Sequence, residues 1–118
     1  MILDKTTISL QAALAGAVSA SEPEIHVDYL VWNNEGLPTK PASTRSVMTG
    51  ATDVTILAAP TTQGYVHEPV GISIYNKDTA SVVVTVKTDD GTERIIIKKT
   101  LTTLQSLCWD KNVGWYVI

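Results

Sequence analysis

The chain has 118 residues, a net charge of −3 and a pI near 5.2, which suits one domain that does not bind nucleic acid through a basic surface. Its charged share is only 18%, below the roughly 25% of an average soluble protein, so we expect a partner to cover part of the surface. The single cysteine, Cys108, excludes an internal disulfide and is typical of a protein made in a reducing cytoplasm. No apolar run approaches the ~20 residues of a membrane span, and residues 1–5 lack the pattern of a signal peptide. We therefore expect no membrane partner.

The N-terminal segment carries its large apolar residues at even positions: Ile8, Leu10, Leu14 and Val18. This parity is the period of a β-strand. The alanines between them favour a helix, whereas Gly16 opposes one, so both structures stay open and an extended conformation is preferred. We expect residues 1–20 to form an N-terminal extended arm and residues 21–118 to form the folded domain.

The remainder of the chain is a series of short β patterns that turn signals separate. Val, Ile and Thr dominate, and their branched Cβ atoms suit a pleated sheet. Strands are expected over residues 25–31, 45–48, 54–58, 70–76, 81–88, 93–101, 104–109 and 114–118. Residues 33–43 contain two asparagines, a glycine and two prolines, which predicts a long exposed loop.

Two turns carry the clearest local signals. Residues 89–92 read Asp-Asp-Gly-Thr, and a glycine after aspartate favours a tight hairpin. Residues 76–79 read Asn-Lys-Asp-Thr, which predicts a turn closed by a side chain. Seven to nine short strands with regular turns predict an all-β fold, namely an antiparallel β-sandwich or jelly roll in a single domain.

Two strands have apolar residues on both faces, at 82–84 (Val-Val-Val) and 95–97 (Ile-Ile-Ile). A two-layer sandwich hides only the inner face of each sheet. The surplus is covered either by a loop or arm of the same chain or by another subunit, and cationic neighbours at 94, 98 and 99 would discourage unspecific strand stacking. The candidate interface residues are Ile8, Leu10, Leu14, Val18, Val83 and Ile96.

The search for chemistry yields no catalytic, cofactor-binding or metal-binding residue. His26 and Asp28 point the same way on a strand, but a metal site needs a third ligand that the sequence does not supply. His67 is interpreted as a loop histidine, Cys108 as a buried structural thiol, and the carboxylates of residues 89 and 90 as turn residues. Motifs of hydrolases, nucleotide-binding proteins and redox proteins are absent from the sequence, so we expect a protein that is not an enzyme.

The aromatic residues leave a second hypothesis open. Trp and Tyr on a sheet face stack on sugars in some proteins and fill a core or an interface in most. Trp32 is the candidate for sugar binding, because it ends the strand over residues 25–31 and opens the expected loop.

Several segments together resemble a group of small virion structural proteins of tailed bacteriophages and prophages. They are Ser9–Val18, Thr52–Pro60, Ile74–Ala80, Gly91–Ile95, Thr100-Leu101 and Gly114–Val117. The resemblance covers most of the chain and implies a virion part without enzymatic activity that is made in the host bacterial cytoplasm.

Within the virion, a capsid decoration or cement protein is similar in size and strand content. Such a protein forms a homo-oligomer and contacts other virion proteins, the capsid protein above all. The alternative is a carbohydrate- or receptor-binding module of a phage fibre or tail. The family pattern has a glycine after the Thr-Leu pair, where this chain has residues 102–105 (Thr-Thr-Leu-Gln), which puts the type of that turn in doubt.

Overall fold

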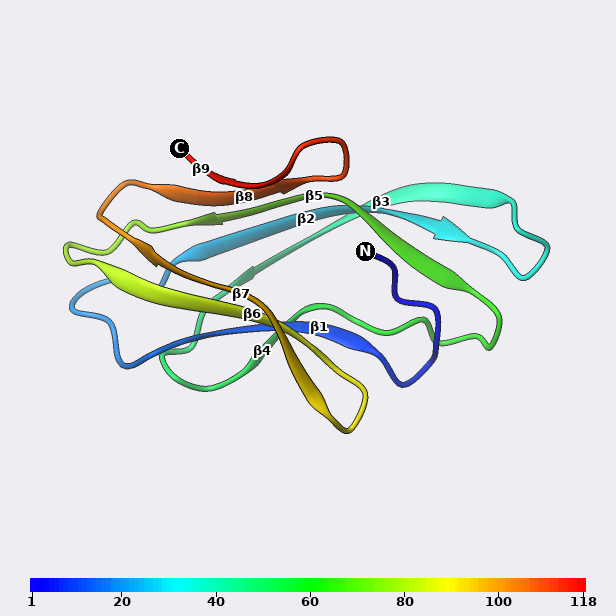
Figure 1. Cartoon of the computed structure of the whole chain (residues 1–118), viewed down its shortest axis with the longest axis horizontal. Coiled ribbons are helices and arrows are strands. Elements are labelled where there is room, and N and C mark those ends of the chain that lie inside the picture. The colour runs from blue at the N-terminus through cyan, green and yellow to red at the C-terminus, as the bar shows by residue number, and fades with distance from the viewer.

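The computed structural model describes all residues from 1 to 118, and they fold into a β-sandwich of two antiparallel sheets without a helix. One sheet has the strand order β4-β1-β6-β7 and the other the order β3-β2-β5-β8-β9. Figure 1 shows the two layers one above the other. The strands are β1 (Ser9–Leu14), β2 (Glu24–Trp32), β3 (Pro38–Val47), β4 (Val54–Leu57), β5 (Val66–Tyr75), β6 (Val82–Asp89), β7 (Glu93–Leu101), β8 (Ser106–Asp110) and β9 (Gly114–Val117). The predicted all-β sandwich is confirmed.

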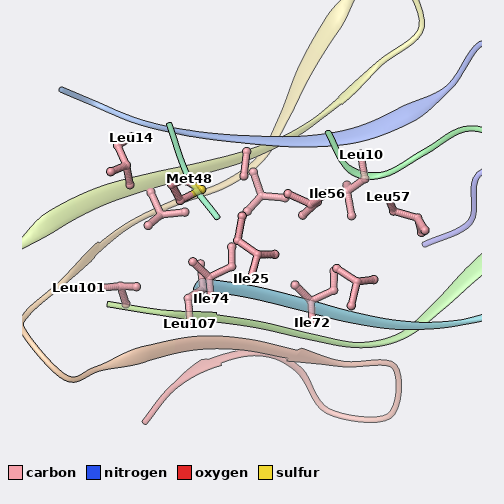
Figure 2. Close-up of a cluster of buried hydrophobic side chains, with 14 of the residues drawn as sticks. Leu10, Leu14, Ile25, Met48, Ile56, Leu57, Ile72, Ile74, Leu101 and Leu107 are labelled. Carbon is pink, nitrogen blue, oxygen red and sulfur yellow. The ribbon is translucent and has the colours of Figure 1, made fainter. Parts of the chain in front are cut away.

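The core lies between the sheets because alternate residues of each strand point inward. Val82, Val84 and Val86 are all buried, as their parity predicts. Figure 2 shows the inward side chains of the two layers facing one another, Leu10 and Ile56 from one sheet and Ile72 and Ile74 from the other. These contacts remove branched aliphatic surface from water, which is the main force that holds such a fold together.

The hairpin between β6 and β7 is confirmed. β6 ends at Asp89 and β7 begins at Glu93. Gly91 has φ +100°, a conformation that only glycine adopts without strain, and its N–H donates to Asp89 Oδ1 at 2.8 Å. Local chemistry therefore fixes this turn, as the sequence indicated.

The N-terminal segment is not an arm. The preference for an extended conformation is right, since residues 9–14 form β1, but β1 lies inside its sheet between β4 and β6. The Leu10 side chain has no exposed surface, and Leu14 is buried as well. Leu3 also exchanges two backbone hydrogen bonds with His67 of β5. The expected boundary at residue 20 is therefore wrong, because the segment before it supplies a central strand of the sandwich.

The expected loop over residues 33–43 is mostly strand. β3 begins at Pro38 and pairs along its length with β2, so only a short turn remains between them. Pro38 and Pro41 lack an N–H and suggested a loop, yet a strand at the edge of a sheet needs no N–H on its open side. β3 has no neighbour but β2, and this edge position is why the prolines are tolerated.

Candidate interaction surfaces

The residues considered for catalysis are held in structural roles. Arg45 Nε donates a hydrogen bond to His26 Nδ1 at 3.3 Å, and His26 Nε2 lies 3.0 Å from Asp28 Oδ1. Nδ1 can accept this hydrogen bond only through a lone pair, so the ring proton is on Nε2 and points to Asp28. Both ring nitrogens of His26 are therefore already engaged on the outer face of the sheet. His67 Nδ1 lies 2.9 Å from the Ala58 carbonyl oxygen, which only accepts. No cluster of three His, Cys, Asp or Glu side chains suitable for a metal ion is present.

Cys108 and the turn carboxylates also sit where structure explains them. Cys108 is buried in β8. Asp89 accepts from a turn N–H, and Asp90 Oδ1 accepts from the Thr92 N–H at 3.2 Å and from Arg94 Nη1 at 3.0 Å. The backbone hydrogen bond from Thr92, followed by the Arg94 contact, lowers the pKa of Asp90. Asp89 and Asp90 thus close a hairpin rather than face each other across a cleft.

The six candidate interface residues fall into two groups. Leu10 and Leu14 belong to the core, and Ile8 and Val18 are half-buried and pack against it, so these four stabilise the chain's own fold. Ile96 is on the surface and Val83 is half-buried. On the outer face Val83 pairs with Thr100, and the Thr85–Lys98 pair separates it from Ile96. Val83 and Ile96 therefore do not form one continuous apolar patch.

The four edge strands of the sandwich differ in how they are protected. β4 and β9 have only four residues each, and β3 carries two prolines and mostly polar side chains; short strands and prolines are ordinary ways to block unwanted pairing. β7 has nine residues and exposes Ile95 to 67% and Ile96 to 36%. β9 adds Tyr116, which is exposed, beside Trp115 and Val117. The apolar edges are β7 and β9.

The edges of β7 and β9 lie on the same side of the sandwich, and a small groove separates them. The groove has a volume of about 170 Å³ and is lined by Ile97, Lys99, Leu107, Trp115, Tyr116 and Val117. Each edge strand pairs with one neighbour only, so one row of backbone N–H and C=O groups stays free on both. We name this side, made of β7, β9 and the groove between them, the open side.

The open side carries its own restraints on strand addition. β7 has a bulge at Ile96, since Val86 pairs with Ile97 and Lys87 with Ile95. A bulge bends the strand and interrupts a regular ladder. Lys98 and Lys99 follow directly and are exposed. Pairing with a long, regular foreign strand is therefore disfavoured, while contact over a limited apolar area remains open.

A cluster of charges fixes the base of the β6–β7 hairpin. Lys87 Nζ lies 2.8 Å from Asp53 Oδ1 and 3.0 Å from Glu93 Oε1, and its side chain is largely buried. The hydrogen bond with Asp53 is the main reason that the pKa of Lys87 is raised, and the same bond lowers the pKa of Asp53. The cluster ties β6 and β7 to the segment before β4.

A buried polar hub ties together three distant segments at the other end of these strands. Asn76 is fully buried, and its Nδ2 donates at 3.1 Å to the carbonyl oxygens of Ala80, Leu101 and Thr102. Its Oδ1 accepts from the Asp78 N–H at 3.0 Å, which is the predicted side-chain turn. The burial of this turn was not predicted, because the sequence shows only that residues 76–79 can turn.

Asp78 completes the hub. Its carboxylate accepts the backbone N–H groups of Ser19, Ala20 and Ser21 at 2.7–3.2 Å, and that of Thr79 at 2.8 Å. The hydrogen bond from Ser19 is the largest influence that lowers the pKa of Asp78, against the opposing effect of burial. This carboxylate thereby pins the chain that follows β1 against the β5–β6 connection.

The sequence did not point to Leu104 or Tyr116. What distinguishes them is a backbone conformation and a place at the edge of a sheet. Leu104, in the turn between β7 and β8, has φ +66° and is 68% exposed. Leu104 lies in residues 102–105, the stretch whose turn type the sequence left in doubt, and a leucine with a positive φ is strained. Tyr116 was expected only as a member of the last strand; its exposure depends on β9 being an edge. The order of strands, which short patterns do not encode, decides its exposure.

Trp32 lines a hollow on the outer face of the five-stranded sheet. The hollow has a volume of about 370 Å³, and its other walls are Asn33, Asn34, Gly36, Gly64, Val66 and Glu68. Gly64 has φ +85°, and a Cβ there would lie 2.9 Å from Asn34 Cβ. The glycine thus lets the loop before β5 approach the β2–β3 turn and form one wall of the hollow.

No family model, no curated protein and no solved structure matches the chain. The chain contains no helix that is long and apolar enough to cross a membrane.

Proposed function

We propose that the chain is a non-enzymatic structural protein of a phage virion, a capsid decoration or cement protein that forms a homo-oligomer and stabilises the particle. The observation that carries the proposal is the open side, where two edge strands with free backbone groups flank an apolar groove on one side of the molecule. On the opposite side, β3 carries two prolines and mostly polar side chains, and β4 is as short as β9. A side with exposed apolar residues on its edge strands is typical of a surface that other subunits cover.

The resemblance to small virion proteins supports the same function. A cement protein attaches through many weak contacts that the symmetry of the particle repeats, so no single contact has to be strong. A modest apolar area on a rigid sandwich meets that requirement. The partners in this proposal are further copies of the chain and other virion proteins, the capsid protein above all.

Light scattering of the purified chain tests the self-association. We expect a mass that is a multiple of 12.7 kDa. Ile96→Lys and Tyr116→Lys place charges on the open side and are expected to shift the mass to that of the monomer. Val47→Lys is the matched control, because Val47 is also exposed and apolar but lies on β3. A single monomer at high concentration, or loss of the oligomer in the Val47 variant alone, would contradict the proposal.

Particle binding tests the second part of the proposal, namely that the chain attaches to the virion and stabilises it. The wild-type chain should sediment with particles built from the capsid protein that its own genome encodes and should raise the temperature at which they break. Ile96→Lys should bind at least about tenfold more weakly, since multivalent attachment amplifies the loss of each contact. Equal sedimentation of both proteins would show that the open side takes no part.

A further inference from the structure

A second hollow lies near the hollow beside Trp32, on the same face of the sheet. The second hollow has a volume of about 460 Å³ and is lined mainly by residues of β2 and β3, with Leu30, Pro41 and Val70 as its apolar part and Asp28 and Lys111 as its charged part. The two hollows are neighbours along β2 and β5, because Trp32 pairs with Val66 and Leu30 pairs with Glu68. Glu68 of the first hollow also lies 3.9 Å from Lys111 of the second. We refer to the two neighbouring hollows together as the groove.

The position of this groove limits what it can bind. β2 is paired on both sides, with β3 and β5, so its backbone groups are already used. An extended peptide that binds by adding a strand needs free backbone groups, and the face of β2 offers none. Recognition has to come from side chains that project from the sheet face.

The chemistry of those side chains favours a neutral, hydroxyl-rich ring compound. Trp32 is half-buried and offers an indole ring whose faces accept apolar C–H surface. Asn34 is exposed, and its amide can both donate and accept, while Glu68 accepts only. A nucleotide or other phosphate is disfavoured, because Asp28 and Glu68 are acidic and Lys111 is paired with Glu68.

From this arrangement we infer that the groove binds a neutral oligosaccharide, with one sugar ring against Trp32 and a second over Leu30 and Val70. Both hollows are shallow and open to solvent, so each ring would lie against the sheet face rather than inside an enclosed pocket. The inference goes beyond the proposed structural function and lies on a different face from the open side. A decoration protein with such a groove would hold glycan of the bacterial surface near the particle.

The test uses the full-length chain labelled with ¹⁵N and three probes, maltotriose, chitotriose and cellotriose, at millimolar concentrations. We expect the indole N–H signal of Trp32 to shift with at least one probe while that of Trp115 stays in place. Asn34→Ala should raise the Kd about fivefold, the equivalent of one lost hydrogen bond. Asn112→Ala, an exposed asparagine in the β8–β9 turn, is the matched control and should leave the Kd unchanged.

Three results of this test would each contradict the inference. No shift with any probe, together with a blank array of neutral glycans, would overturn the inference, as would equal weakening by the Asn34 and Asn112 variants. Binding of only acidic glycans would also contradict it. Because Asn34 is exposed, its replacement does not threaten the fold, and because the signals are read on the free chain, failure here leaves the self-association of the open side untouched.

Discussion

β1 and β7 belong to the same sheet and are both rich in aliphatic residues, yet one is part of the core and the other is surface. β1 lies between β4 and β6, so neighbours cover it on both edges and its large side chains face the second sheet. β7 pairs with β6 alone, and three of its four isoleucine and leucine side chains stay at least partly exposed. The difference teaches that place in the strand order, rather than composition, decides which apolar residues a partner can reach.

The largest difference in the free energy of unfolding is expected when one residue is replaced in each of the two strands. Leu10→Ala should lower the free energy of unfolding by about 3–5 kcal/mol, because it leaves a cavity at a site with no exposed surface. Ile95→Ala, at a β7 side chain that is 67% exposed, should change it by less than about 0.5 kcal/mol, as most surface substitutions do. Urea unfolding measures both. Similar losses in the two variants would mean that β1 is not the buried member of the pair.

The hub of Asn76 and Asp78 ties both strands to the end of the sandwich, since it binds the chain after β1 and the end of β7. Asn76→Ala should cost about 2–3 kcal/mol, because it leaves the buried carbonyl oxygen of Leu101 without its donor. Denaturant unfolding again gives the value. A replacement that costs nothing would show that water can satisfy these carbonyl groups, and Asn112→Ala serves as the exposed control.

Acid should release the β1 side of this hub. The pKa of Asp78 in the folded chain lies below its ordinary value of 3.8, so the unfolded chain binds the proton first as the pH falls. The stability that the carboxylate contributes is therefore fully present above pH 3.8 and is lost as the pH falls through the lower, folded pKa. Unfolding curves of wild type and Asp78→Asn should converge over that window. A constant gap between them would contradict the assignment.

The smallest expected effect lies in the turn that leaves β7. Leu104→Gly should stabilise the chain by about 0.5 kcal/mol, because the relief of a left-handed leucine outweighs the added freedom of glycine in the unfolded chain. Leu37→Gly, an exposed leucine without a positive φ, should instead destabilise. Thermal unfolding resolves the opposite signs, and loss of stability in both variants would show that Leu104 is not strained.

Local patterns predicted much of the fold. The alternation of Val82, Val84 and Val86 and the glycine of the β6–β7 turn are local properties, and both are confirmed. The central place of β1 and the edge place of β3 were missed, because they depend on pairings between residues far apart in the sequence. Pro41 suggested a loop for the same reason, since an edge position tolerates a proline and the edge place of β3 is not visible in the sequence.

The candidate surfaces also contain features that local sequence patterns predict and features that depend on long-range pairing. The exposure of Ile96 agrees with the surplus of apolar residues that the sequence shows, whereas the burial of Leu10 and Leu14 removes the supposed arm. The groove between β7 and β9, and the hollows beside Trp32, arise from elements that the topology brings together. A linear pattern contains no information about such neighbours.

The two prolines of β3 have a consequence for the form that an assembly takes. A subunit with adhesive flanks at both ends adds neighbours without limit and grows into fibres. Here the flank at β3 carries two prolines, which have no N–H to donate, and mostly polar side chains. In the proposed assembly, copies that meet through the open side leave no second flank for further copies, so growth stops at a closed group of fixed size.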